Sequence, residues 1–306
     1  MKYPIENGTV TDWNDMEKIW DKAFEKLGVS PSEYNVMITE NSLNTKINRE
    51  KISEIMFENF DVPGLYITNP AVLSLISSGR FLGIVIDSGE GITSFVPIFD
   101  GYSLQNSKLR MDLAGKDITD YLVKILEESG VSFNTLVQKK IISKLIKEKT
   151  CYVAFDFEKE KNNYKSMTYE MPDGKLINVK DERFRAPEIL FHPEMSGKYF
   201  GGIHQFCCDS INKSDVDLKK DLYNCIYLSG GSTLFSGLPE RLTKEIQKIA
   251  PEIMKYKVRV IADTERKYSA WIGGSLLSSD SNFDSMWITR DEYNEDGPSI
   301  IHKKCF

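Results

Sequence analysis

Residues 83–99 read Gly-Ile-Val-Ile-Asp-Ser-Gly-Glu-Gly-Ile-Thr-Ser-Phe-Val-Pro-Ile-Phe, and this stretch decides the fold. Two apolar runs rich in β-branched residues, 83–87 and 92–99, flank the turn sequence Ser-Gly-Glu-Gly at 88–91. Runs of this kind separated by a short glycine-containing segment are typical of a β-hairpin. The stretch therefore predicts two antiparallel strands joined by a turn at 88–91.

Segments on both sides of this hairpin alternate between strand and helix patterns. Before it, the spacing predicts a helix after Thr11 that Gly28 ends, a strand at 36–39, a helix carrying Ile52 to Phe60, a strand at 65–68, and a helix that Pro70 opens and Gly79 closes. After it, we expect helices at 118–127 and about 136–149, followed by a polar surface loop at 158–165 and a turn at 171–174. The last third of the chain predicts a strand ending at Gly230-Gly231, a helix at 239–249, a strand at 258–262, and a helix through Trp271 and Leu277. This alternation predicts an α/β layer architecture.

Length and composition narrow the class of protein. The 306 residues suit two lobes, and 41% hydrophobic with 27% charged residues is the balance of an ordinary globular protein. A net charge of −6, with acidic and basic residues spread along the chain, argues against nucleic acid as a partner. No apolar run approaches the ~20 residues of a membrane span, and the start lacks a secretory signal, so we expect a cytosolic protein that contacts no membrane.

The sulfur and imidazole side chains predict no metal centre. The five cysteines lack C-x-x-C spacing, and the three histidines lie far apart in the sequence. Reduced thiols are the simplest interpretation in a cytosolic protein.

Two glycine-rich turns follow apolar runs, at 84–91 and 226–231. Glycine lets backbone N–H groups approach an anion, which is how phosphate-binding turns are built. The simpler interpretation is a hairpin turn and a strand-to-helix turn. Asp87 has the same two interpretations, because it could hold the water shell of Mg²⁺ or cap its own turn. Lys147, Glu148 and Lys267 could equally be ordinary surface charges.

The sequence resembles the actin family along its whole length. The segments that carry the resemblance are Lys2–Glu6, Asp15–Trp20, Asn48–Lys51, Ala71–Leu75, Asp112–Gly115, Leu228–Gly231, Glu265–Ser269, Trp271–Gly274, Gly297–Ile300 and Lys304–Phe306. The resemblance implies an α/β, two-lobed ATPase fold with ribonuclease H-like lobes, Mg-ATP in the cleft between them, and head-to-tail assembly into filaments. The small outer lobe would comprise residues 1–77 and 270–306, and the large inner lobe 78–269 with an inserted subdomain at about 114–198.

The resemblance also implies a nucleotide site. The β- and γ-phosphates would lie on the turn formed by Asp87, Ser88, Gly89, Glu90 and Gly91, with Asp87 supporting Mg²⁺ through water. The adenosine end would be lined by Gly115, Lys147, Glu148, Gly230, Gly231, Ser232, Phe235 and Lys267.

Several positions depart from the family pattern. Pro70 stands where the family has the glutamine that orients the attacking water, and proline has no side-chain donor or acceptor. Ser94 and Asn7 each replace a histidine near the phosphates. We also expect the chain to begin after the family's first phosphate-binding turn and flexible lobe, which leaves the small lobe incomplete. These departures predict impaired hydrolysis and impaired filament formation.

The family's partner-binding cleft is matched by Gly79, Tyr102, Leu277, Met286 and Phe306, whereas Asp280 places a charge where the family has leucine.

Three functional hypotheses follow. The first is a divergent, cytoplasmic, actin-like cytoskeletal protein that binds ATP weakly and turns it over poorly. The second is a non-catalytic protein that binds actin or actin-binding proteins without nucleotide. The third is a non-functional, truncated relative.

Overall fold

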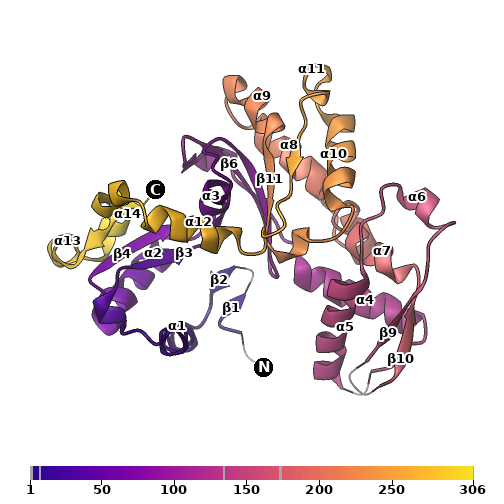
Figure 1. Ribbon diagram of the computed structural model, residues 1–306, viewed down its shortest axis with the longest axis horizontal. Coiled ribbons are helices and arrows are strands. Elements are labelled where there is room, and N and C mark those ends of the chain that lie inside the picture. The colour runs from indigo at the N-terminus through magenta and orange to yellow at the C-terminus, as the bar shows by residue number, and fades with distance from the viewer. Residues whose placement is uncertain (1–2, 7, 134, 172–173, 306) are drawn as a thin grey trace.

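The computed structural model describes residues 3–6, 8–133, 135–171 and 174–305 (Figure 1). Its central sheet has the order β12 (Val260–Ile261), β11 (Ile226–Ser229), β5 (Gly83–Ser88), β6 (Thr93–Phe99), β7 (Tyr102–Ser103), and β8 (Leu109–Met111) also pairs with β6. Strands β5 and β6 are antiparallel and β11 is parallel to β5. The predicted hairpin is therefore confirmed.

A second, smaller sheet has the order β13 (Ile288–Thr289), β4 (Gly64–Thr68), β3 (Val36–Thr39). Strands β3 and β4 are parallel; β3 lies at the predicted residues, and β4 begins one residue before the predicted strand. Helix α2 (Lys46–Glu54) continues into one π-helical turn at Ile55–Asn59 and packs with this sheet. The resulting core combines buried residues from 52–67 with buried residues from 283–305, so the two ends of the chain share one hydrophobic core.

Helix α1 (Trp13–Leu27) lies on this second core (Figure 1). It begins at Asp12, whose carboxylate accepts a hydrogen bond from the Asp15 N–H, and it ends at Gly28 with φ of 69°. Before it, β1 (Ile5–Glu6) and β2 (Thr9–Val10) form a short hairpin. Helix α13 (Arg290–Asp296) and helix α14 (Ile301–Lys304) complete this part of the molecule.

Two helices connect the sheets. Helix α3 (Pro70–Ser77) starts with Pro70 at its first turn, is capped by Asn69, and packs on one face of the central sheet. Helix α12 (Ser269–Ser278) crosses α3 so closely that a Cβ placed on Gly273 would lie 1.8 Å from the carbonyl oxygen of Leu73. Only glycine permits this contact between the helix backbones.

The opposite face of the central sheet is covered by the largest hydrophobic core. Its elements are α4 (Gly115–Glu128), α5 (Leu136–Thr150), α7 (Glu182–Glu188), α8 (Ile203–Asn212), α9 (Val216–Asn224), α10 (Leu238–Ile249), α11 (Glu252–Lys255) and the hairpin of β9 (Met167–Glu170) and β10 (Leu176–Val179). Among the described residues, no helix combines the length and apolar composition needed to cross a membrane.

Two expectations need correction here. The segment 158–165 is not wholly a loop, because α6 occupies Phe157–Glu160, where the Asp156 carboxylate caps the first turn by accepting from the Lys159 N–H. The strand expected at 258–262 is shorter, since only Val260 and Ile261 pair with β11. In the turn expected at 171–174, Gly174 has φ of 80°, while Pro172 and Asp173 lie outside the described residues.

Candidate functional site

A cavity of about 650 Å³ opens beside the carboxyl ends of β5 and β11. Its lining residues are Gly89, Glu90, Lys144, Lys147, Glu148, Cys151, Gly230, Gly231, Ser232, Leu234, Phe235 and Lys267. Nine of them were expected from the sequence to bind a nucleotide. The other expected residues, Asp87, Ser88, Gly91 and Gly115, do not line this cavity. The two glycine-rich turns and helix α5 are thus brought to one place.

The carbonyl oxygen of Gly89 joins two distant segments. It accepts hydrogen bonds from the Gly115 N–H at 3.0 Å and from Ser232 Oγ at 2.7 Å. A Cβ on Gly115 would lie 2.6 Å from Ser232 Oγ, so a larger residue at the start of α4 would push these segments apart. Gly115 therefore shapes the site by being small, although it lies behind the lining.

Ser88 stabilises the β5–β6 turn from inside. It is buried, and its Oγ lies 2.8 Å from Thr93 Oγ1, which donates to the carbonyl oxygen of Leu113 at 2.7 Å. Because the Thr93 hydrogen is used for Leu113, the Ser88 hydroxyl donates to Thr93. The side chain of Ser88 is thus engaged within the turn rather than facing the cavity. Gly91 lies in the same turn.

Asp87 is the last residue but one of β5, and it lies opposite Ser94 on β6 and in register with Ser229 on β11. Burial raises the pKa of its carboxyl group, and a hydrogen bond with Ser229 opposes that rise. Gly230, with φ of 86°, closes over this carboxylate, because a Cβ there would lie 2.8 Å from Asp87 Oδ1 and 2.3 Å from the Ser88 carbonyl oxygen. Only glycine at position 230 leaves space beside the Asp87 carboxylate and the Ser229 hydroxyl. These two groups suit contact with the water molecules that surround a hydrated Mg²⁺ ion.

Lys147 is the buried cation of the site, with 4% of its surface exposed. Its Nζ donates to the carbonyl oxygen of Gly115 at 2.7 Å and to Thr119 Oγ1 at 2.8 Å. Burial lowers the pKa of this amine, while the nearby Glu90 carboxylate raises it. An ammonium group has three hydrogens, so one is left for a ligand in the cavity.

The remaining walls of the cavity combine an aromatic side chain with charged side chains. Phe235 is buried, whereas Glu148 and Lys267 are exposed at the rim, and Lys267 Nζ lies 5.4 Å from the ring centre of Tyr268. An aromatic wall with charges at the mouth suits a flat base attached to a polar group.

Three lining residues, Lys144, Cys151 and Leu234, were missed from the sequence. Lys144 lies three residues before Lys147 on α5, and Cys151 lies four residues after it, directly beyond the end of the helix, so helical periodicity around Lys147 could have identified them. Burial raises the pKa of the Cys151 thiol to about 12, which keeps that thiol neutral.

The two positions that the resemblance assigns to catalysis, Pro70 and Ser94, lie outside the cavity lining. Pro70 opens α3, and its carbonyl oxygen accepts from Ser74 Oγ at 2.8 Å. Ser94 is 5% exposed and sits across from Asp87.

Behind Asp87, hydroxyl groups of Ser74, Ser229 and Ser269 form a chain with oxygen separations of 2.9 and 3.0 Å. This chain joins α3, β11 and α12, and nothing in the sequence alone pointed to it.

The expected partner-binding residues are only partly gathered. Tyr102 is 56% exposed, Gly79 follows α3 with φ of 69°, and Leu277 and Met286 pack partly buried on the second core. The Asp280 carboxylate accepts hydrogen bonds from both the backbone and side-chain nitrogens of Asn282, each at 2.9 Å. Phe306 and Asn7 lie outside the described residues.

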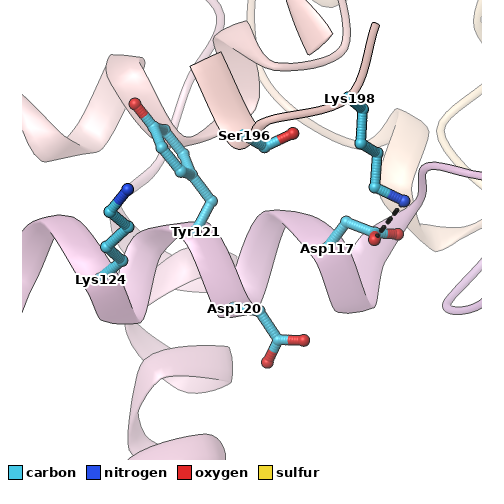
Figure 2. Close-up of a pocket in the computed structure, with 6 residues that line it drawn as sticks. All are labelled: Asp117, Asp120, Tyr121, Lys124, Ser196 and Lys198. Carbon is cyan, nitrogen blue, oxygen red and sulfur yellow. Dashed lines mark ion pairs between the residues drawn. The ribbon is translucent and has the colours of Figure 1, made fainter. Parts of the chain in front are cut away.

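A second cavity, of about 210 Å³, lies between α4 and residues 196–198 (Figure 2). Two of its lining side chains, Asp117 and Lys198, form an ion pair at 2.9 Å, and Asp117 also accepts from the Ala114 N–H. These charged groups stabilise the start of α4, and none of the expected site residues lines this cavity.

One comparison with known proteins bears on this site. A family model described as Actin matches residues 1–306 of the chain.

Proposed function

The chain belongs to the actin family, and we propose that it is an actin-like protein that binds ATP and Mg²⁺ weakly in the 650 Å³ cavity and hydrolyses ATP poorly. Proteins of this family typically bind ATP with Mg²⁺. The observation that carries the proposal is the convergence of both glycine-rich turns with Lys147 and Phe235 around one cavity.

Each wall has a role in this proposal. The Gly89–Glu90 turn offers backbone groups to the phosphates, and Lys147 supplies a fixed positive charge with one hydrogen to donate. Phe235 and Leu234 cover the base, and Lys267 lies at the mouth. Asp87, held by Ser229 beneath Gly230, would hold Mg²⁺ through its water shell, and the ion would offset phosphate charge.

Poor hydrolysis follows from the groups near Asp87. The proline at position 70 presents no side chain that can orient water, and its carbonyl oxygen is already bonded to Ser74. Ser94 is too short to replace an imidazole as a general base, and a serine hydroxyl is a weak base at neutral pH. The nucleotide would then act mainly as a structural ligand that joins the glycine-rich turns to helix α5. We assign these elements to an inner lobe (78–269) and the second core to an outer lobe (1–77, 270–306).

Binding of partner proteins at the cleft near Leu277 is weak in this proposal, because Asp280 places a hydrogen-bonded carboxylate there. Burying that carboxylate against an apolar partner would cost free energy. The family is typically cytoplasmic and cytoskeletal, and we assign the same location to this chain.

The proposal is tested by measuring binding and turnover together. Fluorescent ATP should bind the wild type in the presence of Mg²⁺, and steady-state phosphate release should stay far below that of conventional actin. Gly89→Val should abolish binding without changing the melting temperature of the free protein, because nothing lies within 4 Å of a Cβ at this position. Actin-like phosphate release, or full ATP binding by Gly89→Val, would contradict the proposal.

A second function is favoured by one surface feature. Phe81, Phe99 and Tyr102 are 57%, 47% and 56% exposed, and the Gly101 N–H donates to the Phe81 carbonyl oxygen, which holds the two segments together. Exposed aromatic side chains that gather in this way mark protein-binding surfaces. Under this alternative the chain binds actin or actin-binding proteins without nucleotide. Co-sedimentation with actin filaments that is independent of ATP, and lost in Tyr102→Ala, would support it.

A further inference from the structure

Three buried serines meet behind Asp87, each on a different element. Ser74 lies on α3, Ser229 is the last residue of β11, and Ser269 is the first residue of α12. They are 0%, 3% and 2% exposed. Ser229 Oγ lies 2.9 Å from Ser74 Oγ and 3.0 Å from Ser269 Oγ. Ser229 is thus the centre of a chain of three hydroxyl groups.

The Ser229 hydroxyl also bonds Asp87. The two residues are partners on neighbouring parallel strands, so their side chains leave the sheet on the same face, and a hydrogen bond joins them. An ionised carboxylate can only accept hydrogen bonds. Ser229 is therefore the donor to Asp87.

The hydrogens of the three hydroxyl groups can be assigned by counting. A hydroxyl group donates one hydrogen and accepts up to two. Because Ser229 donates to Asp87, its two other contacts are hydrogen bonds only if Ser74 and Ser269 both donate to it. Three hydrogens then make three bonds. Any other assignment leaves one of these contacts without a hydrogen while Asp87 is ionised.

Each outer serine also has an alternative acceptor. Ser74 Oγ lies 2.8 Å from the Pro70 carbonyl oxygen, and Ser269 Oγ lies 3.1 Å from the Arg266 carbonyl oxygen. A hydroxyl hydrogen turns between two such acceptors by rotation about one bond, and its oxygen stays in place. The Arg266 carbonyl oxygen also accepts from the Gly230 N–H at 3.1 Å, so it keeps a donor when Ser269 turns away.

The charge of Asp87 decides which acceptor the outer serines use. A hydrogen bond that ends on an ionised group is stronger than one between neutral groups, and hydrogen bonds in a chain reinforce one another. With Asp87 ionised, the hydrogens of Ser74 and Ser269 therefore turn toward Ser229. The whole chain then points at the carboxylate.

The crossing of α3 and α12 holds the outer serines in place. Leu73, the neighbour of Ser74, presents its carbonyl oxygen to Gly273, where a Cβ would lie 1.8 Å away. At so close a crossing, the two helices cannot slide past each other without losing backbone contact. Both outer hydroxyl groups are thus kept within reach of Ser229.

We propose that Ser229 is a positioning residue for Asp87, and that Ser74 and Ser269 act through it by donating to the hydroxyl group that holds the carboxylate. This inference rests on the proposed role of Asp87 as the support of hydrated Mg²⁺. Groups that bond a metal-binding side chain from behind fix its orientation before the ion arrives. Loss of either outer hydroxyl therefore weakens Mg²⁺ binding, although no hydrogen bond joins either outer serine to Asp87 in the part of the chain that the structure describes.

The first test compares the affinity for fluorescent ATP in the presence of Mg²⁺ with that in EDTA. Ser229→Ala should reduce the gain from Mg²⁺ about tenfold or more, since it removes a hydrogen bond to a charged group. Ser74→Ala and Ser269→Ala should each reduce it at least about threefold, and neither should add to the loss in the Ser229→Ala background. Ser77→Ala is the matched control on α3, because Ser77 Oγ donates to the Ser74 carbonyl oxygen. It should keep the full gain.

A second test needs no nucleotide. Urea unfolding of the nucleotide-free protein gives the coupling between Ser74→Ala and Asp87→Asn. We expect Ser74→Ala to change the unfolding equilibrium constant at least about threefold less in the Asp87→Asn background, and this difference should vanish when Ser229→Ala is also present. Ser77→Ala should show no coupling to Asp87→Asn.

Two results would overturn the proposal. One is a full gain from Mg²⁺ in both Ser74→Ala and Ser269→Ala, and the other is an effect of Ser74→Ala that stays the same in the Ser229→Ala background. If the wild type itself shows no Mg²⁺-dependent ATP binding, the proposed function fails instead. The coupling in the nucleotide-free protein then decides the inference: its presence supports the positioning of Asp87 by the serines, and its absence overturns it.

Discussion

Lys147 Nζ lies 2.7 Å from the carbonyl oxygen of Gly115, so one buried ammonium group joins helix α5 to the start of α4. The same nitrogen bonds Thr119 one turn further along α4. This arrangement fixes the wall of the cavity before any ligand arrives, because both helices also pack in the largest core. The positive charge is therefore held in place by the fold.

The first prediction concerns this contact. Lys147→Met should lower the free energy of unfolding by about 1–3 kcal/mol, since it removes two charge-assisted hydrogen bonds from a buried site. Lys144→Met is the matched control, because Lys144 is exposed and lies 3.6 Å from Glu90. It should change the free energy of unfolding by less than about 0.5 kcal/mol. Urea denaturation of both variants measures the difference, and equal effects would contradict it.

The second prediction tests the α3–α12 crossing. Gly273→Ala should destabilise the protein by several kcal/mol, because its Cβ would overlap the rigid backbone of Leu73. Gly274→Ala should cost far less, since its Cβ would meet side-chain atoms at 3.3 and 3.4 Å that can shift slightly. Thermal unfolding of the two variants is the measurement. A melting temperature for Gly273→Ala at or above that of Gly274→Ala would rule out the close crossing.

The third prediction concerns Asp87 and Mg²⁺. Burial raises the pKa of this carboxyl above its usual value, so keeping it ionised reduces stability as pH rises through the folded-state pKa. Asp87→Asn removes that cost, and the free protein should melt at the same temperature or higher at pH 7. The variant should lose the Mg²⁺-dependent part of ATP binding. A variant that binds Mg-ATP as tightly as the wild type would exclude the carboxylate as the ion's support.

The fourth prediction is a pH dependence that arises from His204, which does not line the cavity. Burial lowers the pKa of His204 to about 4, and its ring stacks on Phe191 at 5.9 Å. An unfolded histidine takes up its proton near pH 6.5, so between pH 6.5 and about 4 the unfolded state binds more protons than the folded state. Stability should therefore fall on acidification through this window.

His204→Phe keeps the stacking and removes the titration. The fall in unfolding free energy between pH 6.5 and 4 should be smaller in this variant, by at most ~3 kcal/mol. Melts of both proteins at several pH values measure the difference. Parallel pH profiles would show that His204 is not held neutral.

The sequence predicted those elements whose signals are local. Strands β3 and β4 and the β5–β6 hairpin have short apolar runs with clear ends, and Gly28 marks the end of α1 by its conformation. Short helices were harder to predict from the sequence. Helix α7 has only seven residues and contains Pro187, which normally argues against a helix. Its position is set by packing in the large core, which no short window of sequence contains.

The site was predictable to a similar degree. The turn glycines and Lys147 stand in recognisable segments, and the structure gathers them around one cavity. The sequence could not show that Ser88 bonds inward to Thr93, or that Ser74 and Ser269 contact Ser229 across long separations. Those contacts depend on how α3, β11 and α12 meet in space, and that meeting is fixed by tertiary packing.

The most direct test of the account is a thermal melt of the purified protein with and without excess Mg-ATP. A ligand bound only by the folded state at 100 times its dissociation constant adds about 2.7 kcal/mol of stability. We expect one cooperative transition whose midpoint rises with Mg-ATP in the wild type and stays fixed in Gly89→Val. A midpoint that ignores Mg-ATP in the wild type would contradict nucleotide binding in this cavity.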